Sequence, residues 1–294
     1  MSKVNIQFTL FSAFYSPLIV VMAGGYLKQE GLDYDWSVSP PGKSAVDAIE
    51  DGSADVIQTA VIQGVNDLEQ GKTPVALNFA LVNAMDGFFI SAREPDDNFD
   101  WSKLEDAEVV MFGGGQPNYM FRYACHQAGI DYERIRKITP GGPADIDAAF
   151  RAGEGQYVQQ QGPFPQQLAS DGLAHVVAQV GPLIGNCAFS TLAATREWLQ
   201  TDEAAAFMRA YRKARVYLNE ASAAEIAALI HPYFENTDQA ALTDCIAAYQ
   251  ALGTWCVDPQ ITEPAYQVTL DVFEHAGVLS RRHDFAALCT QAPA

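Results

Sequence analysis

Basic residues are scarce in this chain of 294 residues. Lysine and arginine together number 18 against 36 aspartates and glutamates, so the formal net charge is −18 at pH 7. No cluster of basic residues interrupts this acidic background. Because nucleic acids and anionic membranes are bound mainly through basic surfaces, we expect neither of them as a partner.

Long apolar runs are missing as well. The longest lies around 17–23 and is well short of the roughly 18 residues that a membrane-spanning helix needs. No charged, apolar and small-residue segments of an export signal precede the first expected strand at Val4. We therefore expect a soluble protein, either one whose export signal has been removed or one that stays in the cytoplasm with Met1 as its true start.

The patterns of metal, redox and nucleotide sites are also absent. The five cysteines include no C-x-x-C pair, and their odd number leaves at least one thiol unpaired. We expect them to be buried and reduced, which favours a reducing compartment. The five histidines show no H-x-x-x-H or H-E-x-x-H spacing, and neither a G-x-S-x-G elbow nor a P-loop is present. The sequence predicts no metal and no cofactor.

Hydrophobic residues make up 49% of the chain, enough for two lobes to bury cores without disulfides or metals. Apolar strand patterns alternate with helical ones in the first part, which is typical of a mostly parallel α/β sheet. The expected strands are 4–10, 32–38, 55–61, 75–82 and 88–92, and the expected helices are 17–30, 45–51 and 63–70.

A second α/β set follows the polar connection at 93–100. Strands are expected at 109–112, 157–161 and 175–180, and helices from 117 to about 128 and at 144–151. The segment 187–194 then returns to the first lobe, and a helical tail completes the chain. Two capping boxes, Ser222 with Glu225 and Asn236 with Gln239, predict helix starts in this tail.

One stretch carries a family resemblance. Ser16-Pro17 is followed by G-Y-x-x-x-E-G-L-D at 25–33, by Gly42 and by A-I-x-x-G-x-A-D-V at 48–56. This pattern resembles the nitrate, sulfonate, taurine and thiamine-pyrimidine-precursor binding proteins, which are type II periplasmic binding proteins of ABC importers. The resemblance implies two lobes, 1–89 plus 190–294 and 90–189, which close over a small solute by a hinge. It also implies a periplasmic location, an ABC permease as partner and, in our interpretation, a monomer.

Three turns precede helices and are expected to converge on the cleft between the lobes. They are Phe14-Tyr15-Ser16, in which Ser16 is expected to cap the helix; Pro41 to Ser44, in which Ser44 forms a capping box with Asp47; and Gly113 to Tyr119. Each turn presents free backbone N–H groups at the positive end of a helix dipole, so each can accept an oxygen-rich or anionic group. Each of them, taken alone, is equally compatible with an ordinary cap.

Aromatic and amide residues accumulate at the same points, which favours a flat, hydrogen-bonding ligand. Lys43 is the only cation in the three turns, so we rank a neutral heteroaromatic solute, such as a thiamine pyrimidine precursor, slightly above a sulfonate, taurine or nitrate. Tyr15 and Tyr119 are expected to contact it from opposite lobes, at turn positions outside the core. The predicted ligand-binding residues are Phe14, Tyr15, Ser16, Lys43, Ser44, Gln63, Asp86, Gly114, Gly115, Asn118, Tyr119, Tyr157 and Gln159, with Gln161 on the same strand as the last two.

An enzyme or a cytosolic sensor on the same scaffold is the alternative function. The fold resembles that of desulfinases with a cysteine nucleophile and of single-turnover pyrimidine synthases that donate a histidine. The first two turns contain neither cysteine nor histidine, which disfavours both chemistries here. Asp86 is open to two interpretations, as an acid or acceptor in the cleft and as a turn residue. We therefore favour a binding protein over an enzyme.

Overall fold

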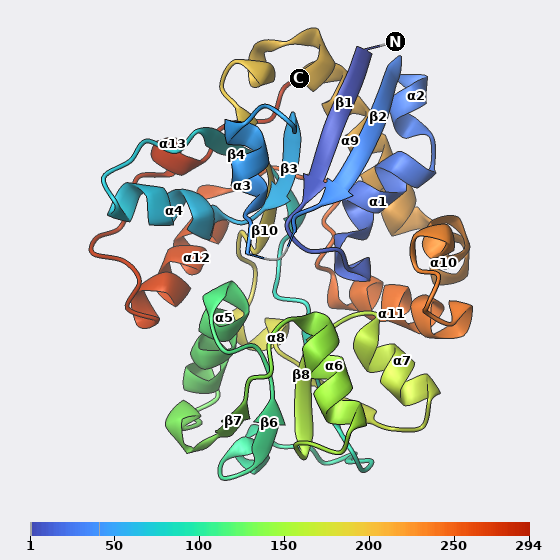
Figure 1. Cartoon of the computed structure of the whole chain (residues 1–294), viewed down its shortest axis with the longest axis vertical. Helices are drawn as coiled ribbons and strands as arrows, with labels where there is room; N and C mark the ends of the chain where they lie inside the picture. The colour runs from blue at the N-terminus through green and yellow to red at the C-terminus, as the bar shows by residue number, and fades with distance from the viewer. Residues whose placement is uncertain (1, 41) are drawn as a thin grey trace.

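Two five-stranded sheets organise the computed structural model, which describes residues 2–40 and 42–294 (Figure 1). The first sheet has the order β2-β1-β3-β10-β4 and consists of β1 (Ser2–Phe8), β2 (Leu32–Val38), β3 (Val56–Thr59), β4 (Ala76–Asn83) and β10 (Ser190–Thr195). The second has the order β7-β6-β8-β5-β9 and consists of β5 (Phe88–Ala92), β6 (Glu108–Val110), β7 (Arg136–Ile138), β8 (Tyr157–Gln161) and β9 (His175–Gln179).

Both sheets follow one topological plan. In the first, β1 pairs in parallel with β2 and β3, and β10 runs antiparallel between β3 and β4. In the second, β6 pairs in parallel with β7 and β8, and β5 runs antiparallel to β8 and β9. Each sheet therefore receives one reversed strand directly after the chain crosses from the other sheet. The predicted two-lobed α/β fold of the type II binding proteins is confirmed.

Helices cover both sheets. Those of the first αβ set are α1 (Ser16–Ala23), α2 (Tyr26–Gln29), α3 (Ala45–Glu50) and α4 (Val61–Glu69). Those of the second are α5 (Gly115–Gln127), α6 (Pro143–Arg151), α7 (Phe164–Ser170) and α8 (Gly181–Ile184). The tail contains α9 (Asp202–Glu220), α10 (Ala223–Ile230), α11 (Gln239–Leu252), α12 (Glu263–His275) and α13 (Phe285–Leu288). Short 3-10 turns are η1 (Ala13–Tyr15), η2 (Trp101–Leu104), η3 (Tyr132–Arg134), η4 (Trp198–Gln200) and η5 (His231–Tyr233). None of the helices described is both long and apolar enough to cross a membrane.

The helix predicted at 17–30 is wrong as a single helix. It is broken at Gly24 and Gly25, because Gly25 adopts a left-handed φ of 69°, and the absence of a side chain at Gly24 leaves room for the ring of Tyr26. Ser16 is not the N-cap either. It is the first residue of α1, and its Oγ donates to the carbonyl of Ala13.

Other boundaries differ in smaller ways. Val61 starts α4 instead of ending a strand, and β7 and α7 were not predicted. The capping box of Ser222 with Glu225 is confirmed. The box of Asn236 with Gln239 is wrong, because Asp238 occupies the N-cap of α11 without a side-chain bond.

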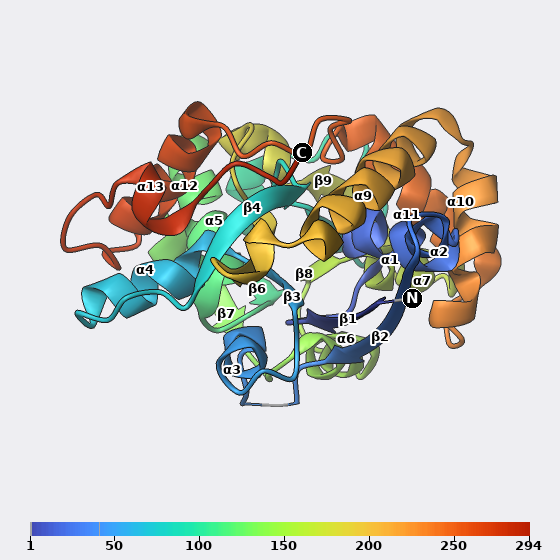
Figure 2. The ribbon, with the colours of Figure 1, turned by 90° about the horizontal axis from the view of Figure 1, so that it is seen from above.

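The helical tail packs against both αβ sets. Helix α9 contacts α1 and α2, α11 contacts α10 and α7, and α12 contacts α5. Figure 2 shows α9, α10 and α11 beside α1 and α2, and α12 beside α5. On α11, the Tyr249 hydroxyl accepts from the Gly162 amide at 2.8 Å and donates to the Gly87 carbonyl at 3.1 Å. The tail thus ties the crossover after β4 to the turn after β8.

Candidate ligand-binding site

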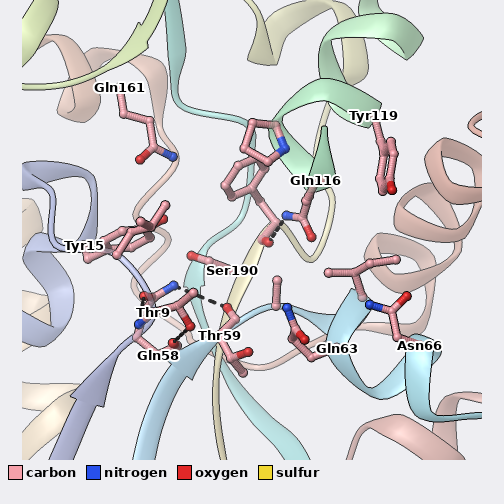
Figure 3. A pocket seen from close by; sticks show the side chains of 16 residues that line it. Thr9, Tyr15, Gln58, Thr59, Gln63, Asn66, Gln116, Tyr119, Gln161 and Ser190 are labelled. Carbon is pink, nitrogen blue, oxygen red and sulfur yellow. Dashed lines mark hydrogen bonds between the residues drawn. The ribbon is translucent and has the colours of Figure 1, made fainter. Parts of the chain in front are cut away.

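A cavity of about 200 Å³ lies where the ends of the two sheets meet (Figure 3). On the side of the first sheet, the wall consists of the ends of β1 and β3 and the first turns of α4. On the side of the second sheet, it consists of the end of β8 and the first turn of α5. The carboxyl ends of parallel strands are where open α/β sheets bind ligands. The lining residues are Thr9, Leu10, Tyr15, Gln58, Thr59, Ala60, Ile62, Gln63, Asn66, Gly115, Gln116, Pro117, Tyr119, Gln161, Phe189 and Ser190.

The cavity wall combines polar and apolar side chains and is uncharged. None of the lining residues is Asp, Glu, Lys, Arg or His. Burial raises the pKa of Tyr15 to about 12, although hydrogen bonds to Gln161 and Gln58 lower it. The Tyr15 phenol is therefore neutral near pH 7, when it can donate or accept a hydrogen bond. The site offers hydrogen bonds and aromatic surface without an ion pair.

Four of the residues predicted from sequence lie in this wall, namely Tyr15, Gln63, Gly115 and Tyr119, together with Gln161. Tyr15 comes from the turn before α1 and Tyr119 from the first turns of α5, so the two rings come from different αβ sets. Figure 3 shows them on opposite sides of the cavity. Tyr15 is only 4% exposed and belongs to the main hydrophobic core, so the expectation that it lies outside the core is wrong.

The other two N-terminal turn residues are placed elsewhere. Phe14 is fully buried and packs against the rings of Phe189 and Tyr249, with centroid distances of 5.3 and 5.0 Å. Ser16 is also fully buried in its bond to Ala13. Phe14 therefore supports the cavity wall from behind, and Ser16 closes the first turn of the helix.

The second predicted turn does not line the cavity. Ser44 caps α3 in the expected capping box with Asp47, and Lys43 is exposed, with its Nζ 3.9 Å from that carboxylate. Pro41 lies outside the described residues. The capping signal identified a helix start correctly, but this helix begins away from the space between the sheets.

Four predicted residues of the second αβ set also lie outside this wall. Gly114 is exposed and precedes α5, and Asn118 donates from Nδ2 to the Phe112 carbonyl and the Tyr132 hydroxyl. Tyr157 packs edge-on against Phe99, and Gln159 is fully buried within β8. Tyr157, Gln159 and Gln161 share one face of β8, so their position along the strand separates them: Gln161 at the strand end lines the cavity, and Gln159 is buried further back.

Asp86 lies in the crossover between β4 and β5 and is fully buried. Its Oδ1 accepts from the Phe88 amide at 2.7 Å, and its Oδ2 has no partner among the residues that the structure describes. Burial raises the pKa of this carboxyl to about 7, although the bond from Phe88 lowers it. Asp86 does not line the cavity and acts as a turn residue of the crossover.

Several lining residues were not predicted. Gln58 is the clearest case: it follows the apolar pair Val56 and Ile57 in β3, next to the strand end, and its Oε1 accepts from the Thr9 amide at 3.2 Å. A polar residue in the last positions of a buried strand is the signal that identifies it. Gln116 lies within the predicted turn Gly113 to Tyr119 but was not singled out in it, and Asn66 carries no comparable signal because it occupies an ordinary position in α4.

Two similarly wound sheets with an uncharged cavity between their strand ends define the type II periplasmic-binding-protein fold. The NMT1-like family matches residues 3–231, and the chain belongs to that family. A curated relative from Bacillus subtilis (strain 168), named "Putative binding protein YtlA", is 28% identical over 285 residues, which are 96% of this chain and 85% of the relative.

Solved structures of low identity share the fold. The alkanesulfonate-binding protein SsuA from Xanthomonas axonopodis pv. citri, solved bound to MOPS, matches with a TM-score of 0.74 and 16% identity over 99% of both chains. The periplasmic nitrate-binding protein NrtA from Synechocystis PCC 6803 matches with a TM-score of 0.66 and 18% identity, over 83% of this chain and 69% of that one. The family resemblance identified in the sequence is confirmed.

Proposed function

We propose that this protein captures a small, uncharged, hydrogen-bonding solute in the cavity and delivers it to an ABC permease outside the cytoplasm. The observation that carries the proposal is the composition of the cavity wall, in which amides, hydroxyls and aromatic rings surround the space without a charged side chain. Burying an ion without an opposite charge costs more than burying a neutral polar group that is fully hydrogen-bonded. A neutral solute suits this wall better than a sulfonate or nitrate ion.

The cavity wall contains both donors and acceptors of hydrogen bonds, and this restricts the class of solute that suits it. The first turn of α5 has no side-chain cap, so its N–H groups are donors at the positive end of the helix dipole. The amides of Gln63 and Asn66 can donate or accept, and the rings of Tyr15 and Tyr119 supply flat surfaces. A small heteroaromatic molecule, such as a thiamine pyrimidine precursor, uses all of these groups. Alkyl sulfonate, taurine and nitrate are the competing ligands.

We further propose that the lobes 1–89 plus 190–294 and 90–189 close over the solute as a monomer. The sheets are connected at 84–87, between β4 and β5, and at 180–189, between β9 and β10. Two short connections permit a hinge rotation while each sheet remains intact. No lining residue is a cysteine, a histidine or a carboxylate, so nothing in the wall favours the enzymatic alternative.

A thermal-shift screen with thiamine pyrimidine precursors, taurine, alkyl sulfonates and nitrate tests the solute class, with calorimetry on each hit. We expect stabilisation by the uncharged heteroaromatic compounds. Selective stabilisation by nitrate or a sulfonate would contradict the neutral-ligand proposal. Small-angle scattering tests the hinge, and an unchanged profile at saturating ligand would contradict closure.

A further inference from the structure

The amide of Gln116 is held in one orientation. Its Nε2 donates to the backbone carbonyl of Phe189 at 2.5 Å. A carbonyl oxygen can only accept, so the atom facing Phe189 must be the amide nitrogen. The Oε1 of Gln116 therefore points away from this bond, and it has no hydrogen-bond partner among the residues that the structure describes.

This oxygen belongs to a residue of the cavity wall. Gln116 is the second residue of α5, lines the cavity and is only 8% exposed. Figure 3 shows its amide in the middle of the wall, with the nitrogen on the Phe189 carbonyl and the oxygen directed toward the space above Gln63 and Asn66. Among the residues that the structure describes, the side-chain amides of Gln63 and Asn66 have no comparable fixed bond, so they can turn to suit a ligand. The Gln116 oxygen is an acceptor of fixed polarity.

A fixed acceptor selects among ligands. A ligand that presents an N–H or O–H group gives Oε1 a hydrogen bond, whereas one that presents a methyl group leaves Oε1 buried and unpaired. A ligand that presents only oxygen lone pairs adds electrostatic repulsion to the same loss. Sites built to hydrogen-bond one group reject analogues that lack it much more strongly than apolar pockets do.

We propose that Gln116 is the specificity-determining acceptor of this cavity and that the solute presents a hydrogen-bond donor to its Oε1. The inference rests on the proposed solute-binding function and deepens it. Amides and amino-substituted heteroaromatic compounds meet the requirement. Nitrate and simple alkyl sulfonates, which only accept hydrogen bonds, do not.

The test uses two pairs of probes in which a methyl group replaces an amino group at nearly constant shape: aminopyrimidine with methylpyrimidine, and benzamide with acetophenone. Calorimetry on the parent protein should show the amino member of each pair binding about tenfold more tightly. In Gln116→Met this ratio should fall to about one, while the methyl probes keep their affinity. The control Gln127→Met alters an exposed glutamine at the other end of the same helix and should leave the ratio unchanged.

A purely structural role for Gln116 predicts a different result, because a damaged site lowers the affinity of both members of a pair and preserves the ratio. Equal affinity of the paired probes for the parent protein overturns the inference without the use of any variant. Binding of ethanesulfonate or nitrate with no binding of the amino probes also overturns it, but leaves solute binding intact. Absence of binding by every probe counts against the proposed function and removes the inference with it.

Discussion

Replacement of Asp86 by Asn should change how stability depends on pH. The carboxyl of Asp86 is fully buried, and its pKa is raised from an ordinary 3.8 to about 7. Between these two pH values the unfolded chain has released the proton while the folded protein still holds it, so the stability of the parent falls as pH rises. Each unit of pKa difference corresponds to about 1.4 kcal/mol, so a difference of about 3 lowers the free energy of unfolding at high pH by about 4 kcal/mol.

The Asn side chain is neutral at every pH and has nearly the shape of the protonated carboxyl, so its Oδ1 can still accept from Phe88. Urea unfolding of parent and variant should therefore give similar free energies near about pH 4, and the variant should be more stable by about 4 kcal/mol near about pH 8. The other carboxylates titrate in both proteins and cancel in the difference. A difference that stays constant across this range would refute the assignment of Asp86 as a buried, protonated acid.

Three further substitutions separate binding from folding. Tyr119→Ala should weaken ligand binding by about 1–3 kcal/mol in calorimetry and change the stability to urea little, because Tyr119 is only partly buried. Tyr15→Ala should lower the free energy of unfolding by about 3–5 kcal/mol, because it empties a core position. Equal stability of the two variants would contradict this expectation. Gly115→Ala should lower stability by about 1–2 kcal/mol because its φ is +71°, while Gly114→Ala, in open space with extended φ, should be neutral in the same assay. Ser222→Ala removes the cap of α10 and should lower the free energy of unfolding by about 1 kcal/mol, and an unchanged value would exclude that cap as a stabilising contact.

The elements predicted best are those whose local pattern is supported by the tertiary structure. Strands β5 and β8 have the bounds expected from sequence, because each is a short apolar or β-prone run between turn residues. Strand β7 was missed since Arg136 and Lys137 give its three residues no apolar alternation. Its pairing with β6, a tertiary contact, supplies what the local sequence lacks.

The break between α1 and α2 is a second feature that the local sequence does not determine. A Gly-Gly pair inside an apolar helical pattern is compatible with a weakened helix as well as with a break. The left-handed φ of Gly25 decides for the break, which leaves α2 as a separate short helix in contact with α9.

The cavity illustrates why turn signals identify only part of a binding site. A capping box predicts where a helix begins, and the prediction at Ser44 is correct, but the box does not predict the direction of the new helix in the fold. Residues at the ends of strands are more informative, because the winding of an α/β sheet brings the carboxyl ends of its parallel strands to one edge. Gln58 and Gln161 satisfy that rule from different sheets, and both line the cavity beside Tyr15. Gln116 lies in the predicted third turn, but that signal does not give the orientation of its amide. The orientation arises only when the return connection places the Phe189 carbonyl against the amide nitrogen.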